Sequence, residues 1–227
     1  MNLKDKKVLV IVAHQDDETI GCGATLKKWS FQGAEIHVCF MTNGNTGIKQ
    51  GTDGKDIVAT RMTEAVKAGV PIGVDKFHTL DMDCQKVVNS KTNFHKVIQK
   101  IREVKPYIII THDQVCKHRD HKRTSQIVEE ATWKANENIL QELGPVHYTE
   151  HLWSCEILDP LPEVDFCVDV TETWEYKTMS MNKYFSQLSI LNDIENYLDG
   201  ISKVRGYSIG AARAEAFRRL GRIPIKL

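Results

Sequence analysis

The sequence lacks an excess of charge of either sign, and it lacks a long hydrophobic run. Its 227 residues contain 30 Lys and Arg and 30 Asp and Glu, so the formal net charge is zero. Because no short run is strongly basic either, we do not expect nucleic acid as a partner. A transmembrane helix needs roughly 20 consecutive apolar residues, and the sequence contains no such run. We therefore expect no membrane span.

The N-terminus also lacks the pattern of a secretory signal peptide. Residues 1–7 carry charges, but they lead into only a short apolar run of the kind that forms a strand. A signal peptide would need a longer apolar segment at this place. We expect a soluble, cytoplasmic protein.

Paired cysteines are missing as well. The six cysteines are scattered, and no C-x-x-C motif is present. Cysteines in strand-like runs behave as small hydrophobic residues. We expect six reduced structural thiols, at Cys22, Cys39, Cys84, Cys116, Cys155 and Cys167.

The first two thirds of the chain alternate between strand and helix patterns. Near-continuous Val and Ile runs are typical of strands that are buried on both faces of a parallel sheet. Strands are predicted at 7–13, 35–41, 75–80 and 107–111, and helices at 17–32, 57–69, 93–105 and 119–136. The pattern predicts an α/β fold with an open, Rossmann-like, mostly parallel and doubly wound sheet, with helices on both faces.

The last third of the chain is less regular. Strands are predicted at 148–157 and 164–170, and residues 173–204 are expected to be mainly helical. The end combines a glycine-containing loop with a short predicted helix at 211–220. A hydrophobic content of 41% suffices for one sizeable core. We find no repeat or linker, so we predict a single domain over residues 1–227.

A polar cluster follows the first predicted strand. The apolar run 8–12 leads directly into the segment A-H-Q-D-D-E at residues 13–18. Charged groups at the end of a buried strand need a partner, and a divalent metal suits this set. We expect His14 and Asp17 to bind a metal, while Asp16 stays free for proton transfer.

A second polar cluster follows the fourth predicted strand. It is the segment H-R-D-H at residues 118–121, after the strand 107–111. In an open sheet with strand order 3-2-1-4-5, the first and fourth strands are neighbours, and ligands bind beyond their carboxyl ends at the topological switch point. The predicted fold therefore brings the two clusters together and places the active site at the carboxyl ends of the strands.

The combined residue types match a known kind of site. Two imidazoles and one carboxylate, with a position left for water, form a recurring catalytic zinc shell. Such a metal activates water, and a free carboxylate beside it can accept a proton. His118 and His121 are three residues apart and share a face of a helical turn. One of them can bind the metal while the other acts on the substrate, and Asp120 can orient a histidine.

Simpler interpretations of these residues exist. A lone histidine in a loop is usually a surface residue, and two Asp at a helix start commonly form an N-cap. Gly21 and Gly23 suggest a dinucleotide fingerprint, but Leu26 stands at the third glycine position. Two carboxylates would also repel a pyrophosphate, so nicotinamide binding is not expected.

The two clusters together resemble the motifs of the LmbE-like (PIG-L) family of zinc-dependent N-deacetylases. Residues 13–18 are similar to the family signature A-H-P-D-D-E, and residues 118–121 to its H-P-D-H or H-x-D-H motif. The resemblance spans nearly the whole chain. Further similar landmarks are T-N-G at 42–44, Arg61 and Glu64 with A-G-V at 68–70, Arg205-Gly206 with Gly210, and A-E-A-F at 214–217.

The resemblance implies hydrolysis of an N-acetyl group, usually on an N-acetylglucosaminyl unit, with release of acetate and a free amine. It implies His14, Asp17 and His121 as ligands of Zn²⁺, and Asp16 as the general base. Another divalent metal in place of Zn²⁺ is the alternative.

The resemblance also implies roles for the residues around the metal. His118 would stabilise the oxyanion or protonate the leaving amine, and Asp120 would orient it. Arg61 would lie in the substrate pocket and hold a substrate oxygen, with Glu64 as its partner. An ordinary exposed pair on one helix face is the simpler interpretation of these last two residues.

The chain departs from the family pattern at two positions. Gln15 replaces the usual proline, so a rigid φ is lost in the segment 13–18, which we call the metal loop. Tyr184 stands where the family often has histidine, in a segment similar to H-x-S-Q. Tyr184 is interpreted as a core residue, with a place near the pocket as the alternative.

The identity of the substrate stays open. Loops 44–56, 81–92 and 144–163 are expected to read it, and Trp153 could stack on a sugar but fits the core better. A small soluble glycoside or conjugate is favoured. Alternatives are an amidase on a thiol conjugate or another N-acyl substrate, a metal-dependent phosphoesterase, and a non-catalytic binding module. A homo-oligomer also stays open.

Overall fold

The computed structural model describes residues 1–50 and 56–221, and their strands form one sheet. Loop 44–56 was expected to read the substrate, and its residues 51–55 lie outside the described residues. The strands are β1 Lys7–Val12, β2 Glu35–Thr42, β3 Lys76–Met82, β4 Ile108–His112, β5 His151–Cys155, β6 Phe166–Asp169 and β7 Ala214–Arg219.

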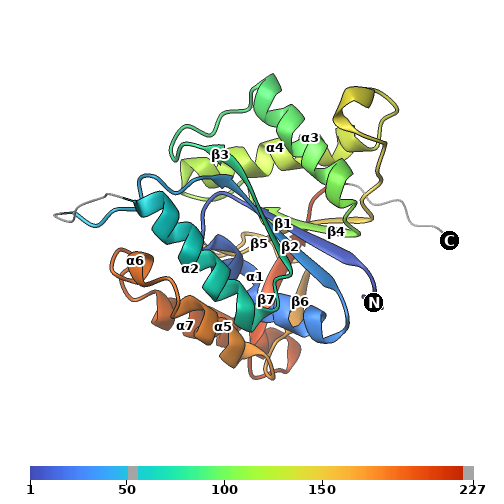
Figure 1. Cartoon of the computed structure of the whole chain (residues 1–227). Helices are drawn as coiled ribbons and strands as arrows, with labels where there is room; N and C mark the ends of the chain where they lie inside the picture. The colour runs from blue at the N-terminus through green and yellow to red at the C-terminus, as the bar shows by residue number, and fades with distance from the viewer. Residues whose placement is uncertain (51–55, 222–227) are drawn as a thin grey trace.

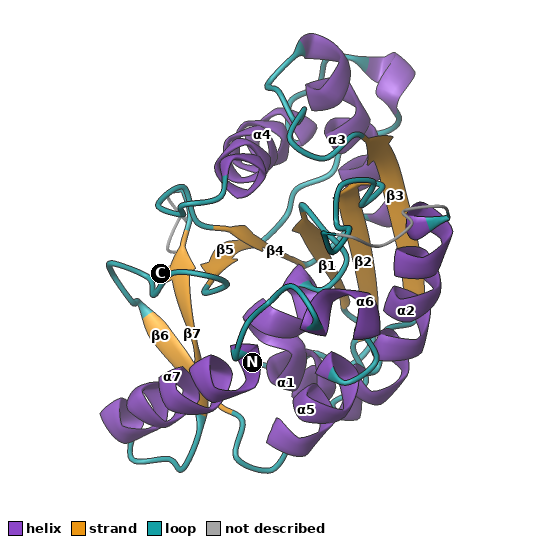
Figure 2. Ribbon diagram, turned by 90° about the vertical axis from the view of Figure 1, so that its left-hand side faces the viewer, coloured by secondary structure: helices purple, strands orange, loops and turns teal. Residues whose placement is uncertain are grey.

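Helices cover both faces of the sheet (Figures 1 and 2). Helices α3 and α4 lie on one face, and α1, α2, α5 and α7 lie on the other. Their bounds are α1 Asp17–Phe31, α2 Ile57–Ile72, α3 Lys91–Val104, α4 Arg119–Ala135, α5 Trp174–Met181, α6 Phe185–Leu188 and α7 Ile194–Ile209, with a short 3-10 turn at Gln141–Leu143.

The order of the strands is β3-β2-β1-β4-β5-β7-β6. Strands β1 to β5 are parallel, whereas β7 runs antiparallel to both β5 and β6. The predicted order of the first five strands and the mostly parallel, doubly wound fold are confirmed.

Two hydrophobic cores follow from the alternation of side chains along each strand. On β1, Val8, Val10 and Val12 point into the core under α1 and α2, while Leu9 and Ile11 point into the core under α3 and α4. All five are at most 1% exposed. A strand that is buried on both faces needs an unbroken apolar run, which explains why this segment was recognisable.

The predicted helix at 211–220 is wrong. Residues Ala214–Arg219 form β7, inserted between β5 and β6. Ala, Glu and Arg favour helices, but here the strand pairings on both sides use the backbone hydrogen bonds. The preceding helix α7 continues to Ile209, so Arg205 and Gly206 lie in a helix and not in a loop.

Helix α1 is kinked directly behind the metal loop. Its backbone leaves helical geometry at Cys22, with φ −149° and ψ 16°. The amides of Ala24 and Thr25 instead donate to the Glu215 carboxylate at 3.2 and 2.8 Å. Lys177 Nζ donates to the Ile20 carbonyl at 2.7 Å and to Glu215. A buried ion pair thus completes the broken turn.

Candidate metal centre

Both predicted clusters lie at the carboxyl edge of the sheet. Strands β1 and β4 pair in parallel, with Val8 opposite Ile108 and Val10 opposite Ile110. The loops that follow them therefore meet above the same edge. A cavity of about 240 Å³ opens there, and its lining residues are His14, Asp16, Asp17, Ile20, Thr46, Gly47, Arg61, Cys84, Gln85, His118, His121, Leu158, Gln187 and Leu191.

Three donor groups of the predicted ligands converge. His14 Nδ1 lies 3.3 Å from Asp17 Oδ2 and 3.3 Å from His121 Nε2, and His121 Nε2 lies 3.3 Å from Asp17 Oδ1. Ligand atoms at about 2.0–2.1 Å from a tetrahedral metal are about 3.3–3.4 Å apart. The spacing of His14, Asp17 and His121 therefore fits a zinc-sized ion.

The electrostatics of the three residues also suit a cation. Burial holds the pKa of His121 at about 2, so this imidazole is neutral, as a ligand must be. Burial would lower the pKa of His14 too, but its hydrogen bonds with Asp120 and Asp17 raise it well above the usual value. His14 therefore favours its protonated form, and a metal bound here would displace that proton. Burial would raise the pKa of Asp17, but His121 and His112 hold it well below its usual value. Asp17 is therefore a carboxylate that attracts positive charge.

His112 is a further histidine in the cluster, and it was not among the predicted site residues. It is the last residue of β4, its ring stacks on that of His121 with centroids 4.0 Å apart, and its Nε2 lies 3.4 Å from Asp17 Oδ2. The Ala13 amide donates to the same Nε2 at 2.8 Å. The lone pair of Nε2 is therefore used by the backbone amide and is not available to a metal. His112 instead holds the start of the metal loop in place through this hydrogen bond.

Two overlapping triads of described residues have one donor atom each within 4.8 Å of one another. They are His14 with His118 and His121, and Asp17 with His112 and His121. His121 belongs to both triads. The predicted ligands combine it with His14 from the first triad and Asp17 from the second. The position of His112 at the end of an apolar strand was the signal that could have identified it.

Asp16 lies beside the three donors and is not one of them. Its carboxylate is 3.6 Å from Arg61 Nη2, and the residue is 6% exposed. Burial raises the pKa of Asp16 to about 8, against the lowering effect of Arg61. A carboxyl group with a raised pKa near a candidate metal is well suited to take up a proton.

His118 also faces the cavity, and its neutral form has a defined tautomer. The amide of Asp120 donates to His118 Nδ1 at 3.2 Å, so the ring proton of the neutral form sits on Nε2. Burial lowers the pKa of His118. The side chain can therefore offer one N–H donor to a bound oxygen.

The Asp120 carboxylate orients a histidine, as the residue types had suggested, but that histidine is His14 and not His118, which the family resemblance implied. Its Oδ2 accepts from His14 Nε2 at 3.2 Å and from the Gln85 amide at 2.6 Å. The bond to Nε2 leaves Nδ1 of His14 free to face Asp17 and His121. Asp120 thus does not face the candidate metal itself but orients His14, which does.

Arg61 reaches the cavity, whereas Glu64 is directed elsewhere. Arg61 is 3% exposed, its Nη2 donates to the Gln15 carbonyl at 2.7 Å, and its Nε has no hydrogen-bond partner among the described residues. The carboxylate of Glu64 accepts from the amide and hydroxyl of Ser186 at 2.9 and 2.6 Å. The expected pairing of Glu64 with Arg61 is therefore replaced by a bond that positions Ser186 and the adjacent Gln187.

All three expected specificity loops contribute to the wall of the cavity, through residues 46–47, 84–85 and 158. Trp153 does not, because it is 3% exposed and packs in the core against Trp29 and Phe166. All six thiols are free. Two of them touch the site: Cys84 lines the cavity, and Cys116 Sγ lies 3.3 Å from His121 Nδ1.

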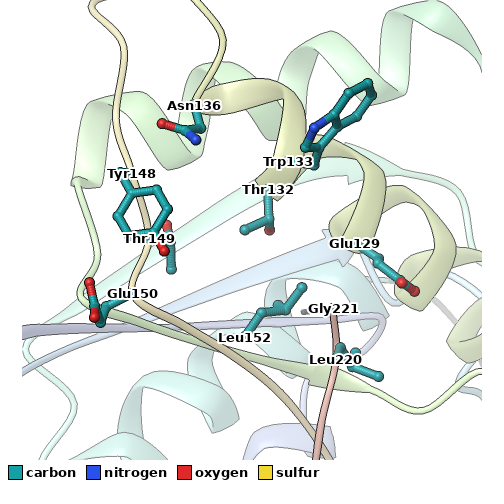
Figure 3. A pocket seen from close by; sticks show the side chains of 10 residues that line it. All are labelled: Glu129, Thr132, Trp133, Asn136, Tyr148, Thr149, Glu150, Leu152, Leu220 and Gly221. Carbon is teal, nitrogen blue, oxygen red and sulfur yellow. The ribbon is translucent and has the colours of Figure 1, made fainter. Parts of the chain in front are cut away.

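A larger cavity of about 440 Å³ lies elsewhere, between the C-terminal half of α4, the start of β5 and the end of β7 (Figure 3). Trp133 and Tyr148 stand at its rim, and Leu152 and Leu220 line its apolar part. Neither of the two donor triads includes a residue of this cavity. Among the described residues, the metal-type chemistry is confined to the carboxyl edge of the sheet.

The chain is similar to known proteins over most of its length. The model of the family described as PIG-L, GlcNAc-PI de-N-acetylase, matches residues 9–132, which is more than half of the chain. The diacetylchitobiose deacetylase of Thermococcus kodakarensis is 26% identical over 225 residues, which cover 94% of this chain and 82% of that protein.

Solved structures share the fold over nearly the whole chain. The N,N'-diacetylchitobiose deacetylase of Pyrococcus horikoshii, in complex with an inhibitor, superposes with a TM-score of 0.85 at 26% identity and covers 94% of this chain and 83% of its own. The 4-carboxy-2-hydroxymuconate hydratase GalB of Pseudomonas putida has a TM-score of 0.84 at 20% identity, with 98% and 99% covered. At that identity the second likeness concerns the fold alone.

Proposed function

The chain belongs to the PIG-L family of de-N-acetylases, and from this premise we propose that it is a metal-dependent N-deacetylase. The reaction is hydrolysis of an N-acetyl amide on a small N-acetylglucosaminyl-type glycoside or conjugate, which yields acetate and a free amine. One observation carries the proposal: the His14, Asp17 and His121 donors lie 3.3 Å apart with Asp16 beside them.

The metal that fits this set of donors is Zn²⁺. Two neutral imidazole nitrogens and one carboxylate are the ligands of many catalytic zinc sites. When bound, such an ion supplies a Lewis acid that polarises a carbonyl and acidifies water. Asp120 fixes the tautomer of His14, and His112 fixes the Ala13 amide at the start of the loop.

Asp16 is the proposed general base. Its carboxylate lies at the cavity but outside the set of ligands, so it remains free to accept a proton from the attacking water. Burial raises the pKa of Asp16, and Arg61 at 3.6 Å opposes that effect and so favours the ionised form, which a base requires. Once protonated, Asp16 holds the proton that the leaving amine needs.

His118 is the proposed donor to the developing oxyanion. Its Nδ1 is occupied by the Asp120 amide, so its Nε2–H is the group available to the substrate carbonyl oxygen. A preorganised donor of this kind stabilises the tetrahedral state more than the ground state. Because burial favours the neutral imidazole, we assign the proton transfer to the amine to Asp16.

The size of the cavity favours a small acyl group. Its volume of about 240 Å³ is below the roughly 300–1,000 Å³ of pockets for drug-sized ligands. Apolar side chains at Ile20, Leu158 and Leu191 line part of it, and the amide of Gln187 offers polar contacts. An acetamido group with one sugar ring suits this lining better than a long acyl chain.

The test is an assay of released acetate over a panel of N-acetylglucosaminyl glycosides and conjugates, with propionyl and longer N-acyl analogues as competitors. Enzyme loaded with Zn²⁺ should release acetate and a stoichiometric free amine. Preference for longer acyl groups would identify an amidase of another kind. If no amide is cleaved by metal-loaded protein, the proposal is wrong.

A further inference from the structure

We propose that Glu18 and Tyr184 form a buried positioning pair that holds Asp16 in the conformation required of the base. The proposal rests on the proposed function, because it concerns how the base of that reaction is oriented. Neither residue belongs to the set of ligand donors of the metal. Their effect is exerted through the backbone of Asp16.

Asp16 has an unusual backbone conformation. Its φ is 128° and its ψ is −29°. L-residues rarely adopt a positive φ, and such values persist only where the surroundings impose them, most often at functional sites. This conformation puts the Asp16 carboxylate on the cavity side while the next residue, Asp17, turns toward the two histidines.

The peptide unit between Gln15 and Asp16 is held at both ends. At one end, Arg61 Nη2 donates to the Gln15 carbonyl at 2.7 Å. At the other end, the Asp16 amide donates to Glu18 Oε2 at 3.2 Å. Because the peptide unit is planar, these two bonds fix the plane from which φ of Asp16 is measured.

Glu18 is itself fixed by hydroxyl groups. Tyr184 Oη donates to Glu18 Oε1 across 166 residues of sequence, and Thr19 Oγ1 donates to the same oxygen at 3.0 Å. Glu18 and Tyr184 are both fully buried, at 0% exposure. Among the described residues, the Glu18 carboxylate makes no salt bridge. A buried carboxylate without a cation is costly, so a gain in stability is a poor explanation for its presence.

The geometry assigns Tyr184 the task of orienting Glu18. Tyr184 precedes α6 and enters the core from the C-terminal third of the chain. Its position in sequence is the one at which the chain departs from the histidine that the family often has. A tyrosine can donate one O–H to Oε1, which leaves Oε2 for the Asp16 amide.

Three substitutions test the pair. Glu18→Ala removes the acceptor of the Asp16 amide, and kcat should fall roughly 10- to 100-fold, since misplacing a reactive group by about 1 Å has an effect of this size. Glu18→Gln keeps one oxygen for the amide, and its NH₂ can donate to the hydroxyls, so it should retain most of the activity. Tyr184→Phe should lower kcat by an intermediate factor. In all three, KM and zinc content should stay at wild-type values.

A matched control separates this effect from the loss of any buried hydroxyl. The hydroxyl of Tyr197 in α7 is buried and has no hydrogen-bond partner among the described residues. Tyr197→Phe removes the same atom as Tyr184→Phe and should leave kcat unchanged. Equal losses of kcat in the two Phe variants would overturn the proposal.

A crystallographic readout distinguishes failure of this inference from failure of the proposed function. In zinc-loaded Glu18→Ala, φ of Asp16 should relax out of the positive region, and its carboxylate should leave Arg61. In Glu18→Gln both should stay in place. If φ near 128° persists in Glu18→Ala, the pair does not hold Asp16, whatever the protein hydrolyses. If φ relaxes but no variant or wild type cleaves an amide, only the proposed reaction is wrong.

Discussion

Replacing Asp120 by asparagine should weaken metal binding, because Asp120 acts on His14. Its Oδ2 accepts from His14 Nε2 at 3.2 Å and from the Gln85 amide at 2.6 Å. Asparagine can keep one oxygen at this place, but a neutral amide oxygen is a weaker acceptor than a carboxylate, so it would support His14 as a ligand less well. Loss of such a carboxylate–histidine contact typically costs about 10- to 100-fold in metal affinity, which is about 1.4–2.7 kcal/mol.

The assay is competition for Zn²⁺ with a chelator of known affinity, followed by kcat at saturating metal. We expect the affinity to fall while kcat of the loaded enzyme changes less. Asp81→Asn is the control, because it makes the same chemical change at an exposed residue of β3. If Asp120→Asn binds Zn²⁺ as the wild type does and loses kcat instead, Asp120 acts through His118, and the reasoning from the His14 contact is refuted.

Four other predictions follow from the same contacts. Asp16→Ala should keep its zinc and lose about 10²- to 10⁴-fold in kcat, whereas His14→Ala should lose both; metal analysis beside acetate release measures this. Chelation should abolish activity and lower the melting temperature, since the metal binds the native state, and added Zn²⁺ should restore both. Burial, with Lys100 and His37 nearby, lowers the pKa of His78 to about 4. Because folding then disfavours protonated His78, the free energy of unfolding should fall as the pH drops from about 6.5 toward 4. Urea unfolding of His78→Gln over the same pH range should show a smaller fall. Lys177→Met should destabilise the fold by about 3–5 kcal/mol, because it leaves Glu215 charged and buried at 4% side-chain exposure; unfolding curves would contradict this if the midpoint did not move.

The central strands β1 and β4 were predictable because a simple physical pattern marks them. A strand that is covered on both faces must be apolar at every position, and the runs at β1 and β4 satisfy this requirement. β7 carries no such mark. Its residues Ala214 to Phe217 are all buried, but they include Glu215, whose charge is compensated only by Lys177 from α5 among the described residues. The partner that makes this strand possible is not visible in the local sequence.

The candidate ligands were predictable for a similar reason, since topology alone brings the ends of β1 and β4 together. The contacts among them were not. Asp120 and His118 are close in sequence, yet the Asp120 carboxylate bonds His14, because the start of a helix directs neighbouring side chains to different sides. Glu64 and Arg61 share a helix, but Ser186 supplies a closer pair of donors for Glu64. Spacing predicts which residues approach the site and not which atoms meet.

The metal loop combines short-range and long-range constraints. Its ligands come from two strand ends, but the conformation of Asp16 depends on Arg61 from α2 and on Glu18, which Tyr184 orients from the C-terminal third of the chain. Gln15, at the position where the family usually has proline, takes part as well. Its side chain donates to the Thr42 carbonyl at 3.0 Å, and its own carbonyl accepts from Arg61. Hydrogen bonds at both ends of this residue thus restrict a loop that a proline ring would otherwise stiffen, so the departure at Gln15 is compatible with a well-ordered base.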